Sequence, residues 1–357
     1  MSAILGAPIS EGIAARLRER YGTLHTDQSP LCSVLDRMGP AERRAVRLVV
    51  VEADPVGACE LARLEELEAI GCVRSSPVNV DLTAASERDI PVVFTPGRNA
   101  AAVAEFTLGL CLSAVRSVAT SHFAIASHLI TVDPGDRRLN DAGDVIWTSP
   151  RGDMRGAPYE VYQGRELSSL AVGVVGFGQV GREVAARLLP LAAEVWICDP
   201  AVPPADIAAA GAYPASLEDL LDQVDLVTLH AKSGQQLLGV AEIRRLRRGS
   251  YLVNTARASI LDYDALADAL MDGHLRGAAL DVFPEEPLPA DSRLLSCPNL
   301  TLTPHLGGAT EEVVNRHSEI LWNALQRLGG DEAWTGLPVA NPAVERGYRA
   351  RRARPTA

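Results

Sequence analysis

The sequence lacks a surplus of positive charge. Its 357 residues contain 34 Lys and Arg against 45 Asp and Glu, which gives a formal net charge of −11 at pH 7. A nucleic-acid surface requires clustered positive charge, so we expect no nucleic-acid partner. Basic residues gather only in the tail, residues 343–357, where arginine recurs among alanine and proline. We expect that tail to be disordered and to bind no partner.

Paired cysteines and long apolar runs are also missing. The six cysteines are scattered and none forms a C-x-x-C pair, so the sequence predicts neither a disulfide framework nor a metal site. No apolar run reaches the roughly 20 residues that span a bilayer. The first residues, Met1 to Leu5, lack the basic-then-apolar pattern of a signal peptide. We therefore expect a cytoplasmic protein without a membrane partner.

Length and composition predict two α/β domains. A chain of 357 residues with 47% hydrophobic residues can bury two cores. In the first hundred residues the patterns predict a helix at 60–70 and short strands at 3–5, 47–51, 72–73 and 91–94. A long apolar helix at 101–118 should pack between the domains. Residues 131–165 should form a connector with little regular structure.

From residue 171 on, strand-like runs alternate with helical stretches, which predicts a parallel, doubly wound sheet. The expected strands are 171–175, 194–198, 225–230, 250–256, 278–282 and 300–303. A helix at 311–328 should return to the first domain. The first domain is therefore expected to be discontinuous, at 1–102 and 304–342, with the second at 103–303.

A glycine-rich turn follows the first strand of the second domain. The first glycine permits a tight turn, the second lets a pyrophosphate approach the backbone, and the third lets the following helix pack closely on the strand. The helix N-terminus adds free N–H groups and a positive dipole end. In this strand–turn–helix context the motif predicts a dinucleotide site. Its residues are Gly176, Phe177, Gly178, Gln179, Val180 and Gly181.

Asp199 closes the next predicted strand. A carboxylate there can accept both hydroxyls of the adenosine ribose and would repel a 2′-phosphate. No arginine follows it in residues 200–204, so the sequence predicts NAD rather than NADP as the cofactor. The alternative is that Asp199 is only a turn residue before Pro200.

Glycine or polar residues stand at, or just past, the carboxyl ends of successive predicted strands. Ligands of open parallel sheets bind outside those ends, so we expect a site at this edge. The role of His230 is open between cofactor contact and packing. The six positions are Gly176, Asp199, His230, Arg257, Asp281 and His305.

The residue types near this edge suit the oxidation of a secondary alcohol. His305 can take the hydroxyl proton, or return it in reduction. Arg257 can hold a carboxylate and polarise a carbonyl. A carboxylate beside the histidine favours the imidazolium and orients the ring. Glu286 is the candidate for that carboxylate, and its neighbour Glu285 is the alternative.

From about Leu64 to beyond Gly308, the chain resembles the D-isomer-specific 2-hydroxyacid dehydrogenase family. The resemblance implies a Rossmann NAD-binding domain at 103–303, a flavodoxin-like substrate domain at 1–102 and 304–342, and a homodimer formed through the helix after Ala101 and the connector. Besides the glycine turn, it is carried by the segments VNVD (78–81), TPGRNA (95–100), VAE (103–105), NTAR (254–257), GAALDVF (277–283), EP (286–287) and TPH (303–305).

The resemblance also implies roles for individual residues. Arg257 would bind the substrate carboxylate and carbonyl, His305 would be the acid/base, and Glu286 its partner. Asp281 would face the nicotinamide carboxamide. The remaining implied contacts are Thr255 and Ala256 for the cofactor, and Arg74, Ser75, Ser76, Val78 and Asn79 for the substrate, whose carboxylate the backbone near Ser76 to Asn79 would cradle.

Ser75 and Ser76 stand where much of the family has glycines, and Ala258 replaces the usual glycine after Arg257. These departures bear on which substrate the chain binds more than on which reaction it catalyses. Arg74 could face a phosphate or another second acid group of the substrate, or could serve loop structure or simple carboxylate attraction. The alternative function is an NAD(H)-sensing, corepressor-like binding protein with little turnover.

Overall fold

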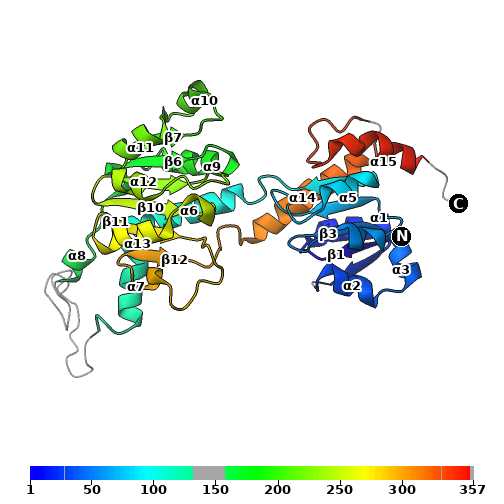
Figure 1. Cartoon of the computed structure of the whole chain (residues 1–357), viewed down its shortest axis with the longest axis horizontal. Coiled ribbons are helices and arrows are strands. Elements are labelled where there is room, and N and C mark those ends of the chain that lie inside the picture. Colours follow the sequence, from blue (N-terminus) through cyan, green and yellow to red (C-terminus); the bar gives the residue numbers. More distant parts are fainter. Residues whose placement is uncertain (28, 132–156, 331, 354–357) are drawn as a thin grey trace. The chain divides into compact units, whose positions relative to one another are not determined.

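The computed structural model describes residues 1–27, 29–131, 157–330 and 332–353. The chain divides into unit 1, Met1–Arg98 with Thr310–Ala357, and unit 2, Asn99–Ala309 (Figure 1). The expected boundaries, after residues 102 and 303, lie inside unit 2. They are shifted because the helix that begins at Ala100 packs entirely in unit 2, and because the loop that carries His305 is hydrogen-bonded to Asp281 of the same unit.

Unit 1 is a five-stranded parallel sheet with the strand order β2-β1-β3-β4-β5. This is the flavodoxin-like order, as predicted. Its strands are β1 (Ser2–Leu5), β2 (Thr23–Thr26), β3 (Val46–Val51), β4 (Ala69–Cys72) and β5 (Val92–Phe94). Its helices are α1 (Glu11–Tyr21), α2 (Leu31–Arg37), α3 (Pro40–Ala45), α4 (Ala58–Ala62), α5 (Leu82–Glu87), α14 (Glu311–Leu328) and α15 (Glu345–Arg352).

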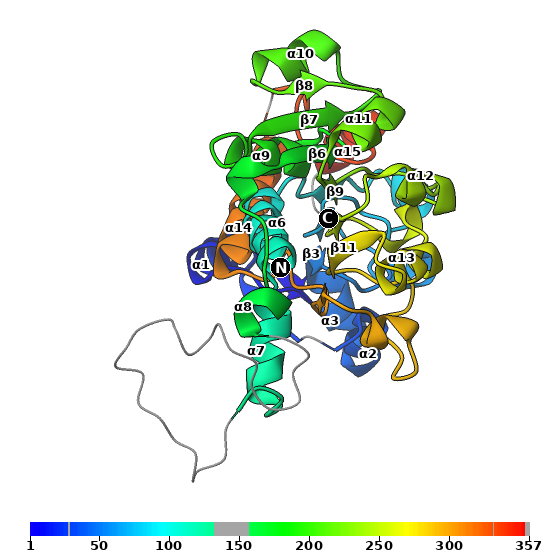
Figure 2. The ribbon, with the colours of Figure 1, turned by 90° about the vertical axis from the view of Figure 1, so that its left-hand side faces the viewer.

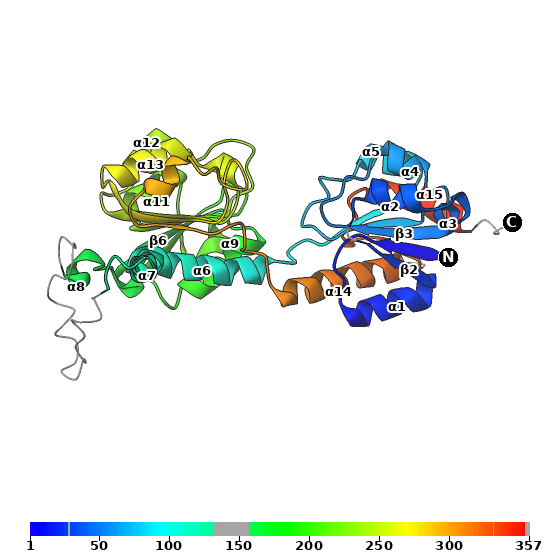
Figure 3. The same ribbon diagram turned by 90° about the horizontal axis from the view of Figure 1, so that it is seen from below.

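Helices cover both faces of this sheet because its strand residues alternate between two cores. Ala3 and Leu5 of β1 belong to the core that contains residues of α1 and α14, whereas Ile4 belongs to the core that contains residues of α2 and α4. Figure 3 shows α1 and α14 on one side of the sheet and α2, α4 and α5 on the other.

The helix expected at 60–70 is wrong. Helix α4 ends at Ala62, and residues 69–72 form strand β4, every residue of which is buried. A strand covered on both faces has a continuous apolar pattern, which periodicity does not separate from a buried helix. The helix predicted at 311–328 is confirmed by α14.

The disordered tail expected at 343–357 is also wrong over the residues that the structure describes. Residues 345–352 form α15, and Tyr348, only 2% exposed, packs beside Trp334 in the unit 1 core. One aromatic side chain that enters a core outweighs the polar composition of its neighbours, because its buried area is large. Residues 354–357 lie outside the described part.

Unit 2 is a seven-stranded parallel sheet with the order β12-β11-β10-β9-β6-β7-β8. It is the doubly wound Rossmann order with one further strand, and the direction of winding reverses between β6 and β9. The strands are β6 (Ala171–Val175), β7 (Glu194–Cys198), β8 (Tyr213–Pro214), β9 (Leu226–Leu229), β10 (Ser250–Asn254), β11 (Leu275–Leu280) and β12 (Leu300–Leu302). The helices are α6 (Ala100–Arg116), α7 (Val118–Ala126), α8 (Pro158–Val161), α9 (Gln179–Leu188), α10 (Pro204–Ala209), α11 (Leu217–Gln223), α12 (Val240–Arg245) and α13 (Tyr263–Met271).

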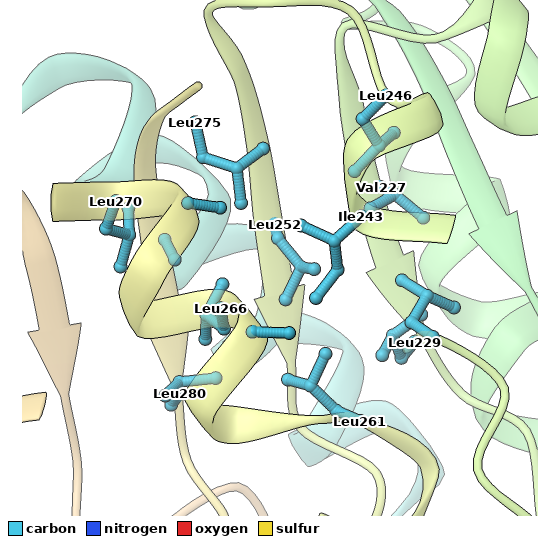
Figure 4. Packing of buried hydrophobic residues seen from close by; sticks show 14 of the residues in the cluster. Val227, Leu229, Ile243, Leu246, Leu252, Leu261, Leu266, Leu270, Leu275 and Leu280 are labelled. Carbon is cyan, nitrogen blue, oxygen red and sulfur yellow. The ribbon is translucent and has the colours of Figure 1, made fainter. Parts of the chain in front are cut away.

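The two faces of the unit 2 sheet carry separate cores. Helices α6 and α9 cover one face, and α11, α12 and α13 cover the other (Figure 3). In the second core, Leu252 of β10 meets Ile243 of α12 and Leu266 of α13 (Figure 4). This packing fixes the strands relative to one another. Because the strands are parallel, their carboxyl ends lie at one edge of the sheet.

Helix α6 is the long apolar helix expected at 101–118. It lies against α9, β10 and β11 of unit 2, because that face of the sheet takes up its apolar surface. Helix α7 projects from the end of α6 (Figure 2).

Within the described ranges no single helix has the length and apolarity to cross a membrane. Helices α6 and α7 pass that test only together, with a bend of 70° between them. Of the predicted connector at 131–165, residues 132–156 lie outside the described part, and 158–161 form α8.

Candidate active site

The glycine turn lies at the point where the winding of the unit 2 sheet reverses. Gly176 has φ +98°, and a Cβ there would lie 2.6 Å from the nitrogen of Ala231. A Cβ on Gly181 would lie 2.0 Å from the carbonyl oxygen of Gly176. Both positions therefore exclude any side chain. Gly178 differs, because its added Cβ meets nothing within 4 Å, so its backbone is open to a ligand at the start of α9.

Asp199 is bound to the glycine turn. Its Oδ2 accepts a hydrogen bond from the N–H of Phe177 at 2.6 Å, and its Oδ1 accepts one from Ala201 at 2.9 Å. The second bond is the turn role considered as the alternative. A carboxylate has about four lone-pair sites, so the two bonds leave capacity for ribose hydroxyls.

His230 packs against the glycine turn and is shielded from solvent. The side chain is buried, its Nε2 lies 2.9 Å from Oγ1 of Thr228, and its Nδ1 has no partner among the residues described. Burial lowers the pKa of His230 to about 3, so the ring is neutral at physiological pH. The burial of His230 agrees with a packing role, and its contact with the cofactor stays a prediction.

Thr255 and Ala256, which follow β10, offer a ligand their backbone more than their side chains. Thr255 is buried, and its hydroxyl donates to Oγ1 of Thr107, whose own proton goes to the carbonyl of Val103. Ala256 donates its N–H to Oδ1 of Asn254. The glycine cradle, the start of α9 and Asp199 fit a dinucleotide, and Gln179 and Val180 begin the helix that would face its phosphates.

Arg257, Glu286 and His305 line one cavity of about 310 Å³ in unit 2. Arg257 follows β10, Glu286 lies in the loop after β11, and His305 lies after β12. Nδ1 of His305 is 2.8 Å from Oε2 of Glu286. The three side chains predicted from the sequence are therefore in one place, and Glu286, not Glu285, contacts the histidine.

The electrostatics of Glu286 fix the direction of that hydrogen bond. Burial raises the pKa of Glu286, but hydrogen bonds from His305 and from the N–H of Phe283, with the nearby charges of His305 and Arg257, lower it by more. The net shift of the pKa is downward. Glu286 is thus ionised and accepts only, so Nδ1 of His305 donates and Nε2 is left for a substrate.

Asp281 holds the histidine loop. Its side chain is 1% exposed; Oδ1 accepts from the hydroxyl of Thr303 at 2.7 Å and from the N–H of Leu306 at 2.8 Å, and Oδ2 accepts from the N–H of Gly307 at 2.8 Å. His305, between these donors, has φ +55°, a left-handed conformation that costs about 1 kcal/mol or more. Both carboxylate oxygens thus accept hydrogen bonds from the histidine loop, and a contact of Asp281 with the nicotinamide carboxamide stays a prediction.

The substrate loop predicted from the sequence lies in unit 1, after β4. Neither Ser75 nor Ser76 has a positive φ, so serine replaces glycine there without backbone strain. The guanidinium of Arg74 has no carboxylate within 4 Å in the part of the chain that the structure describes. Val78 is 79% exposed.

The side chain of Asn79 is occupied within unit 1. Its Nδ2 donates to the carbonyl of Asp54 at 2.7 Å, and its Oδ1 accepts from the thiol of Cys72 at 3.3 Å. Its backbone carbonyl also accepts from Val56. Asn79 therefore holds the loop, and its contact with a substrate stays a prediction.

Three residues of the site were not assigned a role from the sequence. Asn254 was noticed only as part of a motif, although a polar residue at the end of an apolar strand is a signal. Thr303 was likewise noticed only within the TPH motif, and nothing in the sequence indicated its bond to Asp281. Tyr263 carries no signal, because its partner is a backbone carbonyl of another loop. No group of three or more His, Cys, Asp or Glu side chains in the described ranges could hold a metal ion.

Comparison with known proteins identifies the family of this chain. Residues 148–307 match the D-isomer specific 2-hydroxyacid dehydrogenase, NAD binding domain. YoaD of Bacillus subtilis (strain 168), described as a 2-hydroxyacid dehydrogenase, is 34% identical over 292 residues, which are 80% of this chain and 77% of YoaD. The (S)-sulfolactate dehydrogenase of Chromohalobacter salexigens is 35% identical over 76% of this chain and 81% of its own length.

Other relatives are longer or are known by structure. The D-3-phosphoglycerate dehydrogenase of Mycobacterium leprae (strain TN) is 33% identical over 75% of this chain but over only 46% of its own length, so this chain spans about half of it. The crystal structure of the TT0316 protein from Thermus thermophilus has a TM-score of 0.73 at 30% identity and covers 91% of this chain and 96% of that protein. This chain belongs to the D-isomer-specific 2-hydroxyacid dehydrogenase family and is an NAD-dependent enzyme of that family.

Proposed function

We propose that the chain catalyses the interconversion of a small D-2-hydroxy acid and the corresponding 2-oxo acid, with His305 as the acid/base. The substrate would carry a second acidic group besides its carboxylate. The observation that carries this proposal is the shared cavity of Arg257, Glu286 and His305, with the hydrogen bond of 2.8 Å between His305 and Glu286. An acid/base, its carboxylate partner and a guanidinium are the groups this reaction requires.

In reduction, NADH held at the glycine turn would supply a hydride for the carbonyl carbon of the 2-oxo acid. Nε2 of His305 gives its proton to the carbonyl oxygen, and Glu286 stabilises the imidazolium before that step and keeps the ring oriented. Arg257 uses one N–H on the carbonyl of Ala256. Its other donors are left for the substrate carboxylate and the polarised carbonyl oxygen.

For the cofactor we propose that Asp199 accepts from the adenosine ribose and that the N-terminal turn of α9 receives the pyrophosphate. The open space at Gly178 supports the second contact. The bond from Phe177 to Asp199 supports the first, because it holds the carboxylate against the glycine turn. Thr255 and Ala256 would contribute backbone only.

For the substrate we propose that Arg74 receives the second acidic group. A half-buried guanidinium without a carboxylate within 4 Å in the described part of the chain favours an anionic ligand over a purely structural role. Relatives named for sulfolactate and for phosphoglycerate act on acids with a second anionic group, which agrees with this choice. Ser75 and Ser76 would add hydroxyl donors beside it.

A panel of 2-oxo acids tests the function and its specificity together. We expect NADH consumption with dianionic acids such as sulfopyruvate, phosphohydroxypyruvate and oxaloacetate to exceed that with pyruvate or glyoxylate. Arg74→Met should raise KM for the dianionic acids by about 10- to 100-fold and leave the monoanionic acids nearly unchanged, since one charge-assisted contact is lost. Arg16→Met, on an exposed part of α1, is the control. No turnover with any acid, together with tight NADH binding, would favour the NAD(H)-sensing alternative.

We also propose that two copies associate through unit 2. Helix α7 exposes large apolar side chains, among them Phe123 at 65% and Ile125 at 53%, and such a patch marks an interaction surface. A second copy is the occupant that the resemblance implies. Phe123→Asp should convert a dimer to a monomer in light scattering, and a wild-type monomer would contradict the proposal. The cytoplasmic location stays a prediction.

A further inference from the structure

Tyr263, the first residue of α13, is hydrogen-bonded to two loops of the site without lining its cavity. Its hydroxyl donates to the carbonyl of Val282 at 2.5 Å and accepts from Nδ2 of Asn254 at 3.4 Å. The cavity is lined by Val282 itself and by Phe283 on one of these loops, and by Arg257 on the other. Tyr263 therefore joins two segments that both contribute to the site.

On one side, Tyr263 contacts the segment that carries Arg257. Asn254 is completely buried; its Nδ2 also donates to the carbonyl of Arg257 at 3.0 Å, and its Oδ1 accepts from Ala256 at 3.0 Å. The amide of Asn254 thus determines the backbone on both sides of the 256–257 peptide. Its contact with Tyr263 ties this turn to α13.

On the other side, Tyr263 holds the segment that carries Glu286. Val282 is followed by Phe283, whose N–H donates to Oε1 of Glu286 at 3.0 Å, and Oε2 of Glu286 contacts His305. A shift of the Val282 carbonyl would therefore move the N–H of Phe283 and, through Glu286, the imidazole. The path from Tyr263 to His305 therefore runs through the 282–283 peptide and the carboxylate of Glu286.

We propose that Tyr263 is a positioning residue that holds the Glu286 loop in register with the Arg257 turn, so that the acid/base pair and the guanidinium face one cavity. This inference rests on the proposed roles of His305, Glu286 and Arg257. Tyr263 acts through Glu286 and touches neither the substrate nor the reacting atoms.

The protonation state of Tyr263 suits this role. Burial raises its pKa, the hydrogen bond from Asn254 lowers it, and the charge of Glu286 raises it again, with a net upward shift. The hydroxyl is therefore a donor over the whole pH range of an enzyme assay, and Tyr263 does not itself titrate there. A pH effect of its removal must come from the groups that it positions.

Tyr263→Phe tests the proposal, with Tyr251→Phe as the matched control. Tyr251 is a fully buried tyrosine of the same unit whose hydroxyl has no partner among the described residues. We expect Tyr263→Phe to lower kcat by about tenfold, with unchanged affinity for NADH. In a plot of kcat for reduction against pH, the fall on the alkaline side should occur about half a pH unit lower. Tyr251→Phe should change none of these.

A double-mutant cycle separates positioning from a general loss of structure. In a Glu286→Gln background, Tyr263→Phe should cost less than about twofold, because the group through which it acts is already neutral. A full tenfold loss in that background, an unmoved pH limb, or lost NADH binding in Tyr263→Phe would each overturn the inference. If His305→Ala keeps its activity, the proposed function fails instead, and the two failures are thus distinguishable.

Discussion

The two halves of the carboxyl edge of the unit 2 sheet are built by different means. After β6 the edge is shaped by missing side chains, since a Cβ at Gly176 or Gly181 would collide with backbone, and Asp199 after β7 is bound to that glycine turn. After β10, β11 and β12 it is shaped by side chains that bridge segments: Asn254 bonds to Tyr263, Asp281 to Gly307, and Glu286 to His305. The first half depends on the absence of Cβ atoms, and the second depends on hydrogen bonds between segments.

This difference predicts how each half fails. A steric requirement is local, so a change there should damage folding or cofactor binding and leave the chemistry that follows intact. A network acts at a distance, so a change there should damage turnover and leave cofactor binding intact. The following variants test that separation, from the largest expected effect to the smallest.

His305→Ala should lower kcat by about 10²- to 10⁴-fold, because no other group of the cavity can deliver the proton. Affinity for NADH, measured by fluorescence titration, should stay at the wild-type value. His274→Gln is the control, since this histidine contacts the carbonyl of Ile243 away from the cavity. Wild-type turnover in His305→Ala would remove the acid/base assignment.

Gly181→Ala and Gly178→Ala should separate folding from cofactor binding. The added methyl at Gly181 meets the carbonyl oxygen of Gly176 at 2.0 Å, and such overpacking costs about 1–3 kcal/mol. We expect a lower Tm and weak NADH binding. Gly178→Ala, with open space around the methyl, should keep the Tm and lose NADH affinity only. Equal effects in both variants would contradict a phosphate site at Gly178.

Asp281→Asn should reduce turnover about tenfold while NADH affinity holds, and should lower the free energy of unfolding by about 1–3 kcal/mol. The amide offers one acceptor where the carboxylate receives three donors, so the left-handed turn at His305 loses its restraint. Steady-state kinetics and urea unfolding measure the two effects. A variant with normal kcat would show that the turn needs no such restraint.

The pH dependence of stability should show the smallest change. The folded pKa of His230, about 3, lies below its ordinary value of 6.5, so the unfolded chain binds the extra proton. Its contribution is complete above pH 6.5 and is lost as the pH falls; at pH 5.5 the loss is about 1.4 kcal/mol. His317, whose pKa burial also lowers, acts in the same direction. Urea unfolding of His230→Leu at pH 7.5 and 5.5 should show a smaller difference than the wild type, and an equal difference would contradict the buried neutral ring.

The predictability of each element follows the same division. The glycine turn, α9 and α14 were predicted correctly because their patterns arise within one segment. The helix expected at 60–70 and the tail expected at 343–357 were wrong because burial of β4 and of Tyr348 depends on elements far along the chain. The trio Arg257, Glu286 and His305 was identified by type and by family resemblance, and the contact between Glu286 and His305 came from the fold.

By itself, the sequence determined the parallel α/β order, the glycine turn and residue types that suit the reaction, because strand periodicity and glycine sterics are local. Only the tertiary structure decided that Asp281 restrains the histidine loop, that Asn79 is used within its own unit, and that Tyr263 joins two loops. These are hydrogen bonds between segments far apart in the sequence, and a donor's partner is set by which strands lie side by side.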